Sequence, residues 1–147
     1  MSVVLDASLT LAWCFRDEAT ARTAAALHHV AHEGALVPEL WVSEVANGLL
    51  TAMRRLPERV TPARVAEFLL ELRELPIEIV GDREATMVER RVDLARRFGI
   101  TAYDACYLEL ALQSGLPLGT LDGDGRRAGL KQAAVRAGVS LWVTPLS

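Results

Sequence analysis

Five short apolar runs are spread along the chain with helix-like stretches between them, and this alternation constrains the fold more than any other feature. The runs are SVVLD at 2–6, ALVP at 35–38, IEIV at 77–80, PLGTLD at 117–122 and SLWV at 140–143. Each has the length of a strand, and the first is rich in β-branched residues. Because parallel strands need long crossover connections, the pattern predicts an α/β fold, a sandwich with a mainly parallel central sheet flanked by helices.

The stretches between the runs carry local helix signals. Thr61, followed by a proline, is expected to start one helix, and Asp82 is expected to cap the next long helix, which Gly99 would end. We find no internal repeat and no linker rich in glycine, proline or serine. We therefore expect a single domain over residues 1–147.

Composition excludes some classes of protein. The chain is 51% hydrophobic, which is typical of a globular protein, but charges interrupt every apolar run before it could span a membrane. The first residues do not resemble a signal peptide, so we expect a cytoplasmic protein. The two cysteines, Cys14 and Cys106, are far apart in apolar runs and are expected in the core. The net charge of -3 gives no strong global attraction for nucleic acid, although the basic residues are almost all arginine, which suits phosphate.

Acidic residues follow two of the predicted strands. Asp6 comes after VVL, Asp122 comes after TL, and Asp124 lies two residues further on in the same loop. The carboxyl ends of parallel strands meet at one edge of a sheet, where ligands bind in folds of this kind. Polar strand ends are common, so each residue alone has an ordinary structural explanation, but two at one edge form a stronger signal.

Asp104 has two explanations from its position. It lies three residues after Thr101, which is the spacing of a capping box, and an acid in the first turn also interacts well with the helix dipole. It shares a helical stripe with Leu108, Ala111 and Leu112, however, and a carboxylate at the rim of an apolar stripe needs a partner such as a metal ion. Spacing alone leaves both a capping role and a site role open.

Glu44 and Asn47 lie one turn apart on the predicted helix ELWVSEVANGLLTAMRR. Periodicity alone places them on its solvated side. A functional role requires this helix to lie over the same sheet edge as Asp6.

Four segments together resemble a PIN-domain ribonuclease, in particular the VapC-type toxins of bacterial toxin–antitoxin pairs. They are VVLDAS, the E-x-x-N pair in the third helix, TAYDACYLELA and LPLGTLDGD. The resemblance covers essentially the whole chain and implies a PIN-like α/β/α sandwich over residues 1–147. Its acids match Asp6, Glu44, Asp104 and Asp122, with Asp124, Asn47 and Ser8 as auxiliary positions.

The resemblance implies that these residues form a catalytic site for RNA. Asp6, Asp104 and Asp122 would bind Mg²⁺, with Mn²⁺ possible, and Glu44 would bind metal or orient the water. The expected reaction is hydrolysis of an RNA phosphodiester by an activated water, with the 5′ phosphate left on the downstream product. The number of metal ions stays open.

The resemblance also implies a homodimer and a cognate antitoxin protein. Two other classes are weighed against it. A non-catalytic PIN-like RNA- or protein-binding module is the main alternative, although such modules tend to lose acids that are all present here. A phosphatase with Asp6 as nucleophile is disfavoured, because the second acid that this class often carries two residues later is Ser8 here.

Overall fold

The computed structural model describes residues 1–121 and 129–143, and within them the strands form one parallel sheet. The order along the sheet is β3-β2-β1-β4. Every pairing is parallel, with Val4 opposite both Leu36 and Leu118, and Leu36 opposite Glu78. The strands are β1 (Val3–Leu5), β2 (Ala35–Pro38), β3 (Ile77–Val80) and β4 (Leu118–Gly119).

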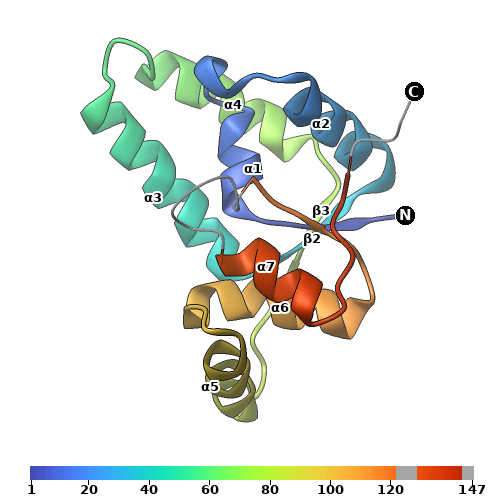
Figure 1. Ribbon diagram of the computed structural model, residues 1–147. Helices are drawn as coiled ribbons and strands as arrows, with labels where there is room; N and C mark the ends of the chain where they lie inside the picture. Colours follow the sequence, from blue (N-terminus) through green and yellow to red (C-terminus); the bar gives the residue numbers. More distant parts are fainter. Residues whose placement is uncertain (122–128, 144–147) are drawn as a thin grey trace.

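Helices cover both faces of this sheet (Figure 1). The helices α5, α6 and α7 gather on one side and α1, α2 and α4 on the other, while α3 runs from the sheet edge along α1. The predicted α/β/α sandwich is therefore confirmed. The α-helices of the described chain are α1 (Ala7–Ala12), α2 (Ala21–Glu33), α3 (Leu40–Arg55), α4 (Pro62–Arg73), α5 (Thr86–Phe98), α6 (Ala102–Ser114) and α7 (Gly129–Arg136).

The hydrophobic core lies on both sides of β1. All three residues of this strand are buried, as is typical of an inner parallel strand with helices on both faces. Leu108 of α6 and Leu118 of β4 are completely buried with it. Both cysteines are also buried, as expected for small core residues. No helix of the described residues is long and apolar enough to span a membrane.

Most of the predicted helix ends are confirmed, because capping depends on a few neighbouring residues. The Arg64 amide donates a hydrogen bond to the Thr61 hydroxyl oxygen at the start of α4. Gly99 ends α5 in the left-handed conformation, with a φ of 65°. The prediction for Asp82 is wrong: α5 begins at Thr86, and the Asp82 carboxylate instead binds the Arg91 side chain.

The last predicted strand, SLWV, forms much less sheet than expected. It makes one parallel bridge, between Leu141 and Leu118, closed by hydrogen bonds from the Leu118 amide to Ser140 and from the Trp142 amide to Leu118. Because β4 has only two residues, it offers a fifth strand little backbone with which to pair.

Gly48 lets α3 approach α1 closely. A Cβ at this position would lie 2.4 Å from Cδ1 of Leu11, which is far inside van der Waals contact. The Trp41 indole adds a second link by donating a hydrogen bond to the Thr10 hydroxyl at 3.0 Å. The side of α3 that carries Gly48 thus packs against α1 instead of facing solvent, and this brings Glu44 to the sheet edge where β1 ends.

Candidate functional site

Asp6 lies at the carboxyl end of β1, and only 5% of its surface is exposed. Its Oδ1 accepts hydrogen bonds from the Ser8 hydroxyl at 2.7 Å and from the Leu9 amide at 3.0 Å. Its Oδ2 accepts a hydrogen bond from the Thr120 hydroxyl. A buried carboxylate requires such donors, since an unsatisfied buried charge is costly. These bonds fix the orientation of Asp6, which also caps α1.

The end of β4 is tied to the end of β1 by side chains. Thr120 binds Asp6 directly, and the Leu121 amide donates to the Ser8 hydroxyl oxygen at 3.2 Å. The Arg22 guanidinium of α2 donates to the Thr120 carbonyl at 3.0 Å. The chain just before residue 122 is therefore held beside Asp6, although Asp122 and Asp124 themselves lie outside the described residues.

Glu44 reaches the same place from α3. It is half-buried, and its Oε1 accepts a hydrogen bond of 2.5 Å from the hydroxyl of Tyr107 on α6. Burial, and then the hydrogen bond to Glu44, raise the pKa of Tyr107 well above its usual range. Tyr107 therefore stays protonated and keeps donating to Glu44.

Asp104 lies in the first turn of α6, and Thr101 is the residue that caps this helix. The Asp104 amide donates a hydrogen bond to the Thr101 hydroxyl oxygen at 3.1 Å. The Asp104 side chain is half-buried and lines a cleft, while Thr101 is the residue that caps the helix. The capping and site explanations are thus compatible, with the cap supplied by Thr101.

One cleft of about 630 Å³ brings together most of the predicted residues that the structure describes. Asp6, Ser8, Glu44 and Asp104 all line it, and they come from three different parts of the chain. Asn47 does not join them: it is exposed on α3 and is not among the described residues lining the cleft. Three carboxylates in one cleft would repel one another, which favours a bound cation.

The sequence did not single out Tyr107 or Thr120, which hold two of these carboxylates. Tyr107 could have been found from its spacing, because residues three apart on a helix share a face and it follows Asp104 by three positions. Thr120 offers no comparable signal beyond its place at the end of a strand.

The carboxylate oxygens in the cleft are suitable ligands for a hard divalent cation, although the described side chains alone do not form a complete metal site. Carboxylate oxygens are the ligands that Mg²⁺ and Mn²⁺ favour. Among the described residues, no group of three or more acidic, histidine or cysteine side chains is spaced to hold a metal ion. The predicted set also includes Asp122, which the structure does not describe. Ser8, Thr120 and Tyr107 would supply the outer hydrogen bonds that orient ligating carboxylates.

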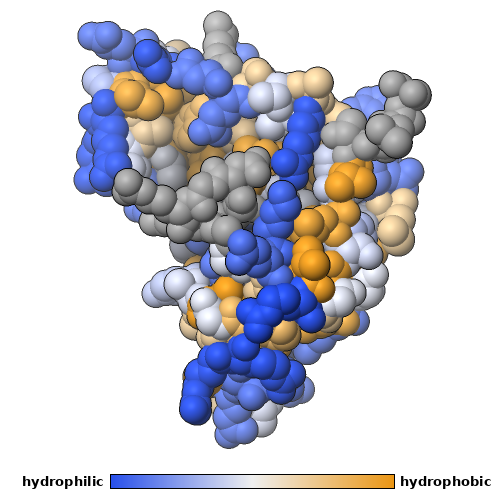
Figure 2. Space-filling model, viewed as in Figure 1, coloured by the Kyte–Doolittle hydropathy of each residue, from blue (hydrophilic) through white to orange (hydrophobic). Residues whose placement is uncertain are grey.

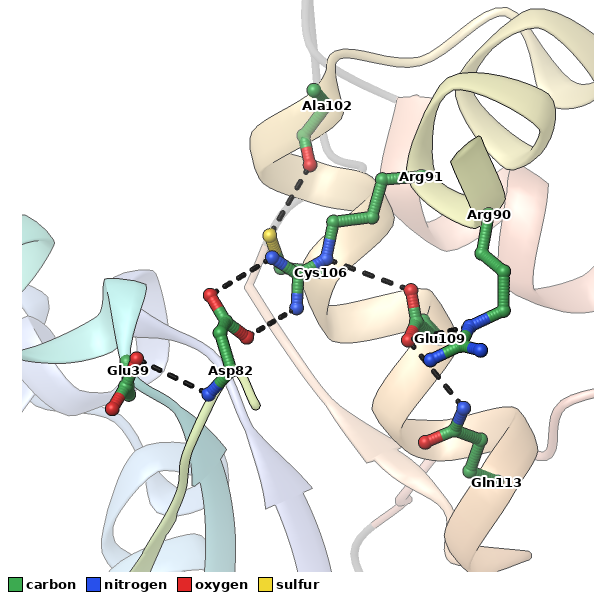
Figure 3. A network of polar contacts seen from close by, with 8 residues as sticks. All are labelled: Glu39, Asp82, Arg90, Arg91, Ala102, Cys106, Glu109 and Gln113. Atoms are coloured by element: carbon green, nitrogen blue, oxygen red, sulfur yellow. Dashed lines mark hydrogen bonds and ion pairs between the residues drawn. The ribbon is translucent and has the colours of Figure 1, made fainter. Parts of the chain in front are cut away.

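Other acids at this sheet edge belong to a structural network (Figure 3). Asp82, just beyond β3, binds Arg91 of α5 through two hydrogen bonds of 2.6 and 3.0 Å. This pairing lowers the pKa of Asp82. Arg91 also lies 3.5 Å from Glu109, a buried residue of α6, and Arg90 lies at the same distance from the other oxygen of Glu109. Asp82 thus ties α5 to the end of β3, Glu109 ties α5 to α6, and neither carboxylate lines the acidic cleft.

Comparison with known proteins gives a family and a fold. The family model described as PIN domain matches residues 3–131. Among solved structures, the chain is similar to PAE2754 from Pyrobaculum aerophilum, with 24% identity, a TM-score of 0.62, and coverage of 94% of this chain and 96% of that one. It is also similar to a toxin–antitoxin complex from Klebsiella pneumoniae, with 14% identity, a TM-score of 0.56, and coverage of 83% and 88%. No curated protein matches the chain. At these identities the structural likenesses establish the fold alone.

Proposed function

The chain belongs to the PIN domain family, whose members are typically nucleases, and on this premise we propose that it is a metal-dependent endoribonuclease toxin of the VapC type. The observation that carries the proposal is the shared cleft of Asp6, Glu44 and Asp104 at the carboxyl edge of a parallel sheet. The match to residues 3–131 supports the further proposal that residues 1–147 form a single PIN domain.

In this proposal Asp6, Asp104 and Asp122 hold Mg²⁺ or Mn²⁺, and Glu44 binds metal or orients the attacking water. A bound divalent ion would lower the pKa of a coordinated water and would neutralise charge on the phosphate. Ser8 holds Asp6 in place for this task, while Asp124 and Asn47 remain auxiliary candidates, of which Asn47 has the weaker support because it lies outside the cleft.

Tyr107 and Glu44 form the part of the proposed machinery that the structure defines best. The Tyr107 hydroxyl binds one oxygen of Glu44 and thereby limits rotation of the carboxylate. The second oxygen of Glu44 can then accept a proton from water or bind a ligand in the cleft. A hydrogen bond of this kind holds the carboxylate in its reactive orientation before the substrate binds. The reaction is slower when the carboxylate must first be oriented.

The proposed substrate is single-stranded or looped RNA, which is cut with the 5′ phosphate left on the downstream product. Unpaired segments expose both backbone and bases to a cleft of this kind. The Arg22 side chain of α2 is hydrogen-bonded to the Thr120 carbonyl, just after β4. It would supply a cation near the acids for a neighbouring phosphate.

We also infer two protein partners, a cognate antitoxin and a second copy of the chain, in a cytoplasmic setting. The likeness to a toxin–antitoxin complex supports the first. For the second, Val88 and Val92 lie one turn apart and are 65% and 49% exposed on α5, a helix with no buried residue. Figure 2 shows α5 as a largely hydrophilic part of the face in view. Light scattering after size-exclusion chromatography would show a 16 kDa species if the homodimer proposal is wrong.

One observation favours the alternative, a non-catalytic PIN-like module that binds RNA or protein. The described carboxylates lack the spacing of a metal cage. The two functions differ in a direct test, because a binding module retains RNA without cutting it.

The test is cleavage of total cellular RNA by the purified protein in Mg²⁺ or Mn²⁺, with the products mapped by sequencing their 5′ ends. We expect Asp6→Asn and Asp104→Asn to abolish cleavage and weaken calorimetric binding of Mn²⁺, with the fold intact by circular dichroism. Asp93→Asn is the matched control, since Asp93 is exposed and, within the part of the chain that the structure describes, forms its ion pair with Arg97 on the surface of α5. Equal cleavage by wild type and both cleft variants would refute the proposed site.

A further inference from the structure

A second cavity adjoins the acidic cleft at Ser8. It has a volume of about 530 Å³, within the range of small-molecule sites, and Ser8 lines both spaces. The Ser8 hydroxyl donates to Asp6 and accepts from the Leu121 amide, and Leu121 also lines the second cavity. The two spaces therefore share the Ser8 side chain, which is hydrogen-bonded to the proposed catalytic carboxylate of Asp6.

The second cavity has an apolar wall and a polar rim. Leu11, Phe15 and Leu121 form the apolar wall, and all three are partly exposed while packing against the core. Glu18 and Thr20 are exposed at the rim. An aromatic side chain beside aliphatic ones, with polar groups at the mouth, suits a flat, partly polar ring.

The walls are held rigid by contacts between the α1–α2 connection and its neighbours. Thr20 and Thr23 cap α2 reciprocally, and the Trp13 indole donates to the Thr23 carbonyl at 2.9 Å. From α4, the Arg64 guanidinium donates to the carbonyls of Trp13 and Cys14 at 3.0 and 3.2 Å. The cavity is thus preformed, so an occupant would bind without the cost of ordering this segment.

A cation also lies close to this cavity. Arg22 precedes Thr23 in the chain, and its guanidinium binds the carbonyl of Thr120, the residue before Leu121. Both neighbours, Thr23 and Leu121, line the cavity. An apolar slot with an arginine at its side and the metal-binding acids at its end matches the alternation of base and phosphate along a single strand of RNA.

We propose that this cavity receives an unpaired RNA base next to the scissile phosphate, with the base stacked on Phe15. The proposal deepens the nuclease function and rests on it, because it places the base relative to the acids that would cut the backbone. Stacking of a base on an aromatic side chain contributes about 1–3 kcal/mol, which corresponds to about a 5- to 150-fold change in affinity.

The test compares a ten-nucleotide oligouridine with a ten-unit ribose phosphate chain that has no bases, bound in Ca²⁺ to wild type and to Phe15→Leu. Leucine keeps most of the packing and removes the aromatic face. Phe98→Leu is the matched control, because Phe98 is also partly buried against the core but lines neither cavity among the described residues. We expect Phe15→Leu to weaken oligouridine binding about 5- to 150-fold and to leave binding of the chain without bases unaffected, and we expect Phe98→Leu to change neither.

A second measurement needs no variant, in case Phe15→Leu does not fold. Oligouridine with 5-iodouridine at its fifth position is irradiated with the wild-type protein, and the crosslinked peptide is identified by mass spectrometry. We expect the crosslink at Phe15. Crosslinks confined to the peptide of Tyr103, the exposed aromatic residue in the acidic cleft, would overturn the proposal.

The outcomes separate this proposal from the nuclease function. Equal loss of both oligomers in Phe15→Leu, or no loss of either, overturns the base site even if the wild type cuts RNA. Base-dependent binding with a crosslink at Phe15, but no cleavage of RNA in Mg²⁺ or Mn²⁺, upholds the base site and overturns the nuclease, leaving an RNA-binding module.

Discussion

Replacing Tyr107 with phenylalanine removes one hydroxyl that joins α6 to α3 inside the acidic cleft. That hydroxyl donates a 2.5 Å hydrogen bond to Glu44, 63 positions away in the chain, and Tyr107 is only 2% exposed. Phenylalanine fills nearly the same volume, so packing around the ring is kept. The change therefore isolates the contribution of one hydrogen bond to stability and to the function of Glu44.

The effect on stability follows from the burial of the two partners. A hydrogen bond to a charged group contributes about 1.5–3 kcal/mol, but Glu44 is only half-buried and water can replace part of the lost bond. We expect the free energy of unfolding to fall by about 1–2 kcal/mol, which for this chain length is about 2–8 °C in Tm.

The effect on the proposed activity is larger than the effect on stability. Loss of an outer hydrogen bond to a ligating or catalytic carboxylate commonly costs 10- to 100-fold in metal affinity or activity. We expect Tyr107→Phe to lower the RNA cleavage rate, or the affinity for Mn²⁺, by about this factor at a temperature where the variant is fully folded.

The assay combines calorimetric titration of Mn²⁺, single-turnover cleavage and thermal unfolding followed by circular dichroism. Tyr103→Phe is the control for stability and Mn²⁺ affinity, because it makes the same substitution at a 63% exposed tyrosine on the same helix; it is not a control for cleavage, since Tyr103 also lines the cleft. If Tyr107→Phe loses stability as expected but keeps both cleavage rate and Mn²⁺ affinity within twofold of wild type, the hydrogen bond is structural only and the positioning argument is refuted.

Three further predictions concern the packing and charges that place the cleft. Gly48→Ala should lower stability by about 1–2 kcal/mol in urea unfolding, because the new Cβ meets the Leu11 side chain and this clash outweighs the gain in helix propensity; unchanged stability would mean that the Leu11 side chain turns aside without cost and that Gly48 is not required for the approach of α3 to α1. Arg91→Met should cost about 3 kcal/mol, because it removes one of the two arginines beside the buried Glu109 and also the partner of Asp82, and adding Glu109→Leu should recover part of this loss in the same assay; no recovery would contradict the ion-pair explanation. Because Arg91 lowers the pKa of Asp82, this carboxylate stabilises the fold above its unfolded pKa of about 3.9, and the stabilisation is lost as pH falls below it. Urea unfolding across pH 3–7 should therefore show a weaker loss at acid pH for Asp82→Asn than for wild type, and equal slopes would count against the pairing.

Local signals in the sequence predicted the elements of the fold. Strand length, helix starts such as Thr61 and helix ends such as Gly99 depend on residues within a few positions, so they are legible without the tertiary structure. Asp82 is a residue type that often caps helices, but α5 begins only at Thr86. The Asp82 carboxylate binds Arg91, nine positions away, instead of a backbone amide at the start of the helix. A side-chain pair at that separation leaves no periodic pattern in the sequence.

The sequence by itself determined that Asp6 ends a strand of a parallel sheet, and its motifs pointed to Glu44 and Asp104 as companions. Only the tertiary structure decided that they meet in one cleft. The close approach of α3 to α1 at Gly48 brings Glu44 in, and the contacts from Thr120 and Tyr107 that hold the carboxylates join residues 114 and 63 positions apart. Strand ends and caps are fixed by local backbone geometry, whereas these contacts depend on how whole helices pack, and no short stretch of sequence records that packing.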